Sequence, residues 1–168
     1  MRGNAPLSEL LRTTLIRGLS PPAFWHAMRP AMKSKITWVS DKTFTGQTSD
    51  GHSIVIGTAT DECPKPGPSA MELVLMGAGT CSSWDVVEIL KKGRQQIDDV
   101  IVELDADRAD EPPKVFSRIH LHFIVKGRDV SEAKVERAIA LSVEKYCSAV
   151  AMLEKTATVT HDFEVIET

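Results

Sequence analysis

Hydrophobic residues are most concentrated between positions 69 and 93, where apolar side chains would occupy every face of a helix. Four consecutive apolar residues begin at Leu73, and the apolar pattern resumes at Val86. A helix that is apolar on all sides is typical of a protein interior. Three acidic residues interrupt the run, so it contains no stretch of about 18 apolar residues like those that span a membrane. The pattern therefore predicts one long buried helix, with Cys81 near its middle.

Both ends of this predicted helix carry boundary signals. Ser69 and Glu72 have the spacing of a capping box, in which each side chain accepts a hydrogen bond from the backbone amide of the other residue. Gly93 follows two lysines, and glycine after basic residues is typical of a helix C-terminus. Three prolines between positions 64 and 68 disfavour helix immediately upstream. These signals place the helix ends at 69 and 93.

On both sides of the helix, the period of the apolar positions changes to two, which is typical of strands. Residues 35–57 predict two or three antiparallel strands, with a hairpin turn at Asp50 and Gly51. After the helix, the pattern predicts strands at 97–108 and 115–126, a helix from 130 to about 146 capped by Asp129, a short helix around 150–153 and a strand at 156–166. This order predicts an α+β fold in one domain, residues 35–168.

Residues 1–34 differ in composition from the rest of the chain, with four prolines and five basic residues against one acid. Several leucines in this segment share one helical stripe. Three interpretations stay open: a short amphipathic helix that packs on the body or on a partner subunit, an acid-poor targeting segment, or translated sequence upstream of a start at Met32. We favour a peripheral N-terminal arm, because nothing in it has the pattern of a catalytic site.

Composition narrows the classes of function. The net charge of −3 and the aromatic content of 5% argue against binding to nucleic acid or to an anionic membrane. Cys63, Cys81 and Cys147 are too few for the disulfide framework of a secreted protein, and their odd number does not suit one. Their spacing matches no zinc motif, so we expect no metal and no cofactor. The simplest compartment is the reducing cytoplasm, where a pair of thiols favours a chemical role.

The three thiols have different sequence environments. Cys147 follows Lys145 by two residues and lies near the predicted start of a helix, and both features favour a thiolate. Cys81 is too far from its helix start to benefit from the helix dipole, and Asp85, four residues on, would raise the pKa of the thiol. Cys63 lies in the proline-rich loop and is interpreted as an exposed bystander, with an intermolecular disulfide as the alternative.

Two segments, PGPSAMELVLMGAGTCSSWDVV around Cys81 and EKYCSAVAMLEKT around Cys147, resemble the OsmC/Ohr family of thiol-dependent hydroperoxide reductases. The resemblance is to the OsmC-like branch and covers about residues 33–167. It implies an intertwined homodimer, in which the long helix of each subunit is buried and two active sites lie at the subunit interface. It also implies that Cys81 attacks the peroxide, that Cys147 resolves the sulfenic acid as a disulfide, and that a dithiol reductant restores both thiols.

Two features differ from the family's peroxidases, which use an arginine on an early strand and a glutamate near the helix start. The matching positions, 43–46, contain no arginine, and Arg118 is one residue that could replace it. Glu72 is close to the glutamate's position but lies nine residues before Cys81, about 180° around the helix, so capping is favoured. Glu72 and Asp85 are therefore only supporting candidates. An alternative stays open, a non-catalytic binding protein for an apolar small molecule at the dimer interface, and behind it a purely structural role for the cysteines.

The remaining candidates concern substrate and metal. Met76 and Trp84 would give the site an apolar lining, which favours organic hydroperoxides as the substrate class. His120 and His122 face one side of a predicted strand and would form half a metal site. Because no third ligand is nearby in the sequence, two solvent-facing histidines are the simpler interpretation. His161 is expected on the surface of the last strand.

Overall fold

The computed structural model describes residues 31–61 and 64–168. Nearly all of the predicted N-terminal arm, and also Cys63, lie outside the described residues. The elements are, in chain order, β1 (Ser34–Ser40), β2 (Thr43–Thr48), β3 (Ser53–Gly57), α1 (Ala70–Lys92), β4 (Gln96–Arg108), β5 (Phe116–Arg128), α2 (Glu132–Leu141), a π-helical turn (Ser142–Tyr146), α3 (Ser148–Leu153) and β6 (Thr158–Glu167). This order confirms the α+β fold, with three strands before the long helix.

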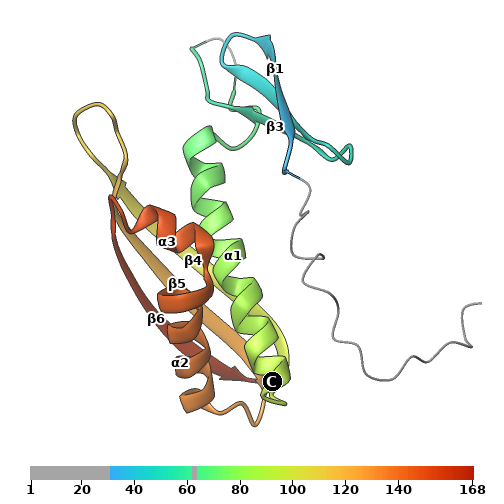
Figure 1. The fold of residues 1–168 in the computed structure, drawn as a ribbon, viewed down its shortest axis with the longest axis vertical. Coiled ribbons are helices and arrows are strands. Elements are labelled where there is room, and N and C mark those ends of the chain that lie inside the picture. The colour runs from blue at the N-terminus through green and yellow to red at the C-terminus, as the bar shows by residue number, and fades with distance from the viewer. Residues whose placement is uncertain (1–30, 62–63) are drawn as a thin grey trace, which may run out of the picture.

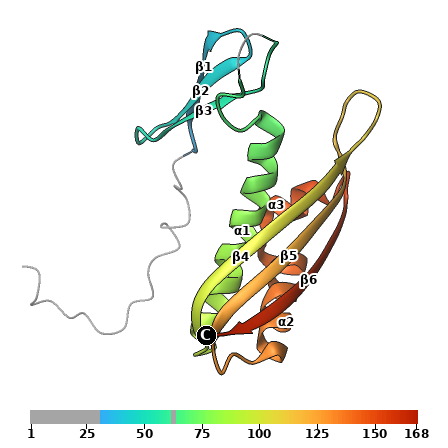
Figure 2. The same ribbon diagram turned by 180° about the vertical axis from the view of Figure 1, so that it is seen from behind.

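The strands form two separate sheets. β1, β2 and β3 make an antiparallel meander, which lies beyond the N-terminal end of α1 (Figure 1). In the second sheet, β4 pairs antiparallel with β5, and β5 pairs parallel with β6. A parallel pair needs a crossover connection, and α2, the π-helical turn and α3 supply it. Helices α1, α2 and α3 all lie on one face of this sheet, while its other face is seen uncovered in Figure 2.

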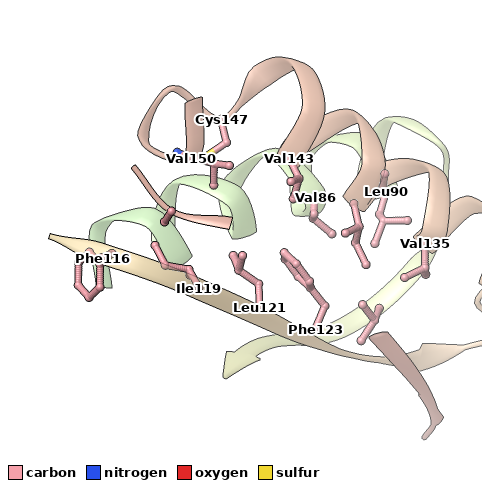
Figure 3. Packing of buried hydrophobic residues seen from close by; sticks show 14 residues of the cluster. Val86, Leu90, Phe116, Ile119, Leu121, Phe123, Val135, Val143, Cys147 and Val150 are labelled. Carbon is pink, nitrogen blue, oxygen red and sulfur yellow. The ribbon is translucent and has the colours of Figure 1, made fainter. Parts of the chain in front are cut away.

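The hydrophobic core lies between the second sheet and the helices. Alternate residues of β5 point into it, and Leu121, Phe123 and Val125 are fully buried. Figure 3 shows Leu121 and Phe123 facing residues from α1 and α2, among them Leu90 and Val135. Complete burial of a side chain of this size contributes roughly 1.5–3 kcal/mol. This core holds α1 and the α2–α3 segment against each other, and these segments carry the two central cysteines.

Helix α1 is buried along one face in the single chain. Ala78, Gly79 and Leu90 are buried, and Gly79 lies so close to the Leu104 side chain of β4 that an added Cβ would come within 2.7 Å of it. On other faces, Met76 is 52% exposed and Trp84 71%. Burial on all sides therefore does not arise within one chain, because one sheet can cover only one face of a helix. By length and composition alone α1 could also cross a membrane, a test that core helices of soluble proteins pass as well.

Local sequence signals predict both ends of α1 correctly but misplace the start of α2. The capping box is present, since the Glu72 amide donates to Ser69 Oγ at 3.3 Å and the Ser69 amide donates to Glu72 Oε2 at 2.7 Å. Gly93 ends α1 and donates to the carbonyl oxygen of Ile89 at 2.8 Å. The predicted cap at Asp129 is wrong, because Ser131 precedes the first helical residue and makes no side-chain capping bond. Asp129 instead has a positive φ of 52°.

Candidate functional site

Helix α1 carries Cys81 on a face that contacts the core, and its thiol is partly exposed. Ser82 follows it directly and is completely buried, with its hydroxyl donating to the carbonyl oxygen of Ala78 at 2.6 Å. Cys81 is therefore a half-buried residue on a helix that the hydrophobic core holds in place.

The π-helical turn sets the position of Cys147. The predicted helix from 130 to about 146 is interrupted after Leu141. There the Cys147 amide donates to the carbonyl oxygen of Ser142, five residues back, at 2.8 Å. Cys147 is then the N-cap residue of α3, and its Sγ accepts from the Val150 amide at 3.5 Å. Figure 3 shows it at the junction of the two helical segments, above the core.

The structure brings the two thiols together. Both are reduced, and the Cys147 Sγ lies 3.9 Å from the carbonyl oxygen of Ala78, one turn before Cys81 on α1. Burial, and after it the neighbouring Cys81, raises the pKa of the Cys147 thiol, the Val150 amide lowers it in part, and the net value is about 11. The expectation that helix start and Lys145 make Cys147 the thiolate is therefore wrong, because burial outweighs both. Cys147 keeps its proton at neutral pH.

Asp85 and a residue that the sequence did not single out, Ser142, lie beside this pair. The Ser142 hydroxyl is completely buried and donates to the Ser82 carbonyl oxygen at 3.1 Å, with Asp85 Oδ2 at 3.3 Å as a second acceptor. The sequence alone could have pointed to Ser142, because it lies seven residues after Val135 and therefore on the same helical stripe as this buried residue. A serine at a position expected to be apolar points to a specific polar contact.

Glu72 lies away from the thiols in this chain. Its carboxylate forms an ion pair with Lys65, with Nζ–Oε2 at 2.5 Å, in addition to the capping bonds. The Lys65 ammonium and then the Ser69 amide hold the pKa of Glu72 at about 2. It lies nine helical positions before Cys81, roughly 13 Å away along the axis. In the single chain Glu72 is a cap and not a partner of Cys81.

Arg118 does not replace the arginine that positions 43–46 lack. It lies on the face of the second sheet that the helices do not cover, opposite the core-facing residues of β5. There it donates to Asp107 Oδ2 at 2.6 Å and to Asp105 Oδ2 at 3.0 Å across the β4–β5 pair. Within one chain Arg118 therefore does not serve the thiols, because the sheet itself separates it from them.

His120 and His122 also lie on this outer face, and both meet Asp162 of β6. His122 Nδ1 lies 2.5 Å and His120 Nε2 3.3 Å from Asp162 Oδ1, while His120 Nδ1 pairs with Thr160 Oγ1 at 2.8 Å. Their side chains are 31% exposed, so they are half-buried partners of a carboxylate and not free surface residues. His161 is exposed. Among residues 31–61 and 64–168, no group of three or more potential ligands is arranged to hold a metal.

The two adjacent thiols on this fold can be compared with known proteins. A family model described as OsmC-like protein matches residues 60–162. The chain belongs to the OsmC family. Protein YhfA of Escherichia coli K12 is 48% identical over 136 residues, which are 80% of this chain and 98% of that protein.

Solved structures of the OsmC fold agree with this assignment. A hypothetical protein from Aquifex aeolicus VF5 is 32% identical, with a TM-score of 0.74 over 83% of this chain and 98% of that one. An organic hydroperoxide resistance protein OsmC from Legionella pneumophila is 16% identical, with a TM-score of 0.61 over 82% of this chain and 99% of that one, and shares the fold. At 16% identity, the likeness to the Legionella protein shows the shared fold alone.

Proposed function

We propose that the chain is a thiol-dependent peroxidase that reduces organic hydroperoxides, with Cys81 as the peroxidatic and Cys147 as the resolving residue. The observation that carries this proposal is the pairing of a partly exposed thiol with a buried, protonated one. In this proposal a peroxide reaches the sulfur of the half-buried Cys81, and the Cys147 thiol lies beside it and keeps its proton. Family membership supports the same order of reaction.

The reaction balances with a dithiol as the only co-reactant. The Cys81 thiolate attacks the distal peroxide oxygen, the O–O bond breaks, and the alkoxide leaves as an alcohol after taking up a proton. Cys81 is then a sulfenic acid. The Cys147 sulfur attacks the Cys81 sulfur, its proton leaves with the hydroxyl group as water, and a Cys81–Cys147 disulfide forms. A reduced dithiol exchanges with this disulfide, restoring both thiols and becoming a disulfide itself.

The surface of α1 supports an apolar substrate class. Trp84 and Val87 line a hollow of about 320 Å³ on the exposed side of the helix. A second hollow of about 300 Å³, near the N-terminal end, is lined by residues that include Met76 and Leu104. Both hollows also contain charged side chains, among them Glu88 and Lys91 in the first and Lys65 and Glu72 in the second. The proposal of an organic hydroperoxide as substrate therefore rests on the apolar part of each lining.

We further propose a homodimer. Large apolar side chains stay exposed on α1 and on the β1–β3 sheet, among them Trp38 at 65% and Trp84 at 71%. Several large exposed apolar side chains of this kind support an interaction surface. A second copy would cover α1 and complete the lining of the site. A water-soluble cytoplasmic dimer, with no role in binding nucleic acid or membranes, fits the charge of −3 and the acidic residues within α1.

The second candidate is a non-catalytic protein that binds an apolar small molecule at the dimer interface. It is favoured by one observation, the strand β2, whose sequence TFTGQT contains no arginine to polarise a peroxide. Both candidates share the fold and the apolar lining. They differ in whether Cys81 reacts.

The test uses reduced full-length protein and near-stoichiometric cumene hydroperoxide. The peroxidase is supported if peroxide disappears with turnover once dithiol is supplied, and if peptide mapping finds a Cys81–Cys147 disulfide. Cys147→Ser should stop at a Cys81 sulfenic acid that dimedone traps, and Cys81→Ser should consume nothing. Cys63→Ser is the matched control and should keep full turnover. Unreacted thiols and undiminished peroxide in the wild-type protein would overturn the peroxidase and leave the binding protein.

A further inference from the structure

In the described part of the chain, only two polar side chains are buried completely, Ser82 and Ser142. Both lie in the contact between α1 and the segment that leads to Cys147. Ser82 bonds within its own helix, to the Ala78 carbonyl oxygen. Ser142 reaches across, and its hydroxyl joins the two segments over 60 residues of sequence. Buried polar groups of this kind specify one arrangement of the elements they join.

Ser142 holds Cys147 through the backbone as well. Its carbonyl oxygen accepts from the Cys147 amide at 2.8 Å, and this bond closes the π-helical turn. Its hydroxyl meanwhile bonds to the Ser82 carbonyl oxygen and approaches Asp85 Oδ2, one and four residues after Cys81. One residue therefore connects the turn that ends at Cys147 to the helix that carries Cys81. π-Helical turns are rare and are found frequently at functional sites.

The alternative to this turn is an ordinary helix. If α2 continued with regular helical bonds, the Cys147 amide would donate to Val143 instead of Ser142. A shift of one residue rotates a helical position by about 100°, which would turn the Cys147 side chain away from α1. A disulfide requires the two Cα atoms to lie within about 7 Å, with suitable side-chain directions. The π-helical turn is therefore a condition for the Cys81–Cys147 bond.

We propose that Ser142 is a positioning residue, which holds Cys147 within disulfide reach of Cys81 through its hydroxyl bond to the Ser82 carbonyl oxygen and Asp85. It touches neither peroxide nor sulfur. Its contribution lies in the closure of the disulfide and in the stability of that disulfide against reduction. The inference rests on the proposed function for its biological meaning, but the thiol pair itself can be studied without peroxide.

The decisive measurement is the equilibrium of the Cys81–Cys147 pair with mixtures of reduced and oxidised dithiothreitol, in a Cys63→Ser background. Oxidised dithiothreitol takes up the two hydrogens of the thiols, so the exchange balances without peroxide. In Ser142→Ala we expect the equilibrium constant for disulfide formation to fall about tenfold, which corresponds to about 30 mV in a two-electron couple. Asp85→Ala, which leaves the bond to the Ser82 carbonyl oxygen, should lower it less.

Ser83→Ala is the matched control. Ser83 lies on the same helix, and its hydroxyl donates to Gly79 at 2.7 Å without reaching the α2–α3 segment. The Ser83→Ala variant should leave the reduction potential of the Cys81–Cys147 pair unchanged. Unfolding midpoints of the reduced and the oxidised forms separate positioning from stability, because a merely structural loss lowers both alike and leaves the potential unchanged. A potential in Ser142→Ala equal to that of the control overturns the proposal, whether or not the variant is less stable.

The kinetic arm distinguishes this proposal from the peroxidase. After one equivalent of cumene hydroperoxide, Ser142→Ala should form the Cys81 sulfenic acid at the wild-type rate but close the disulfide about tenfold more slowly. If the wild-type protein does not react with peroxide but its disulfide potential differs from that of Ser142→Ala as expected, the proposed peroxidase activity is refuted and the role of Ser142 is supported. If the wild-type protein turns over and Ser142→Ala closes its disulfide at the same rate, the role of Ser142 fails alone.

Discussion

The raised pKa of Cys147 gives a prediction that can be worked out in numbers. A thiol with the ordinary value of 9.0 is about one-tenth ionised at pH 8, while a thiol with a pKa of about 11 is about one-thousandth ionised. Burial is the main cause, since Cys147 is 1% exposed. Cys147 should therefore carry about a hundredfold less thiolate than an unburied cysteine at this pH.

The ultraviolet absorbance of the thiolate measures this directly. The titration is performed in a Cys63→Ser background and repeated with Cys147→Ser added. Tyr146, the single tyrosine of the chain, contributes equally to both curves and cancels in the difference. The difference curve should rise between pH 10 and 12, centred near the value of about 11.

The raised pKa of Cys147 also makes the stability of the reduced protein depend on pH. Because the pKa of Cys147 is higher in the folded protein than in the unfolded chain, its contribution is fully present below pH 9.0 and is lost as the pH rises through about 11. The reduced protein should therefore lose stability over this range, and the Cys147→Ser variant should lose less. A difference curve centred at or below pH 9.0 would show that burial does not govern this thiol and would remove the argument for its protonated state.

Phe123→Ala should lower the free energy of unfolding, measured with urea, by about 3–5 kcal/mol, because Phe123 is completely buried. Val115→Ala, at a partly exposed position, should lower it far less. Equal losses in the two variants would contradict the described core. The Asp162→Asn variant should lose most stability between pH 3.8 and 6.5, because contact between Asp162 and His122 lowers the pKa of Asp162 and raises that of His122. A loss of stability that does not vary with pH would refute this pairing. Trp84→Glu should convert the proposed dimer to a monomer in sedimentation experiments, and an unchanged mass would place the interface elsewhere.

The cysteine site shows how far sequence reasoning reaches. The motif around Cys81 and the one around Cys147 were enough to expect the two thiols together, and the structure does bring them into contact. The protonation state of Cys147 was predicted wrongly. Sequence neighbours such as Lys145 suggested a thiolate, but the Lys145 ammonium lies over the Tyr146 ring, 5.4 Å from its centroid. The environment of a sulfur is set by what packs on it, which neighbouring residues in the sequence do not reveal.

Contacts between distant segments were missed for the same reason. Asp162 meets His122 from 40 residues away, and Ser142 bonds to Ser82 from 60 residues away. Arg118 was considered for the site because only its residue type was known. The register of β4 with β5 decides that it pairs with Asp107 on the outer face. None of these partners can be identified before the alignment of the strands and the packing of the helices are known.

What the sequence determined by itself is local in the chain. The ends of α1 followed from Ser69, Glu72 and Gly93, because a cap involves residues only three or four positions apart. The strands followed from alternation with period two, and the family followed from residues around the cysteines. The tertiary structure alone decided the π-helical turn, the burial of Cys147 and the single covered face of α1. These depend on which surfaces meet, and burial and hydrogen bonding between segments outweigh the preferences of each segment alone.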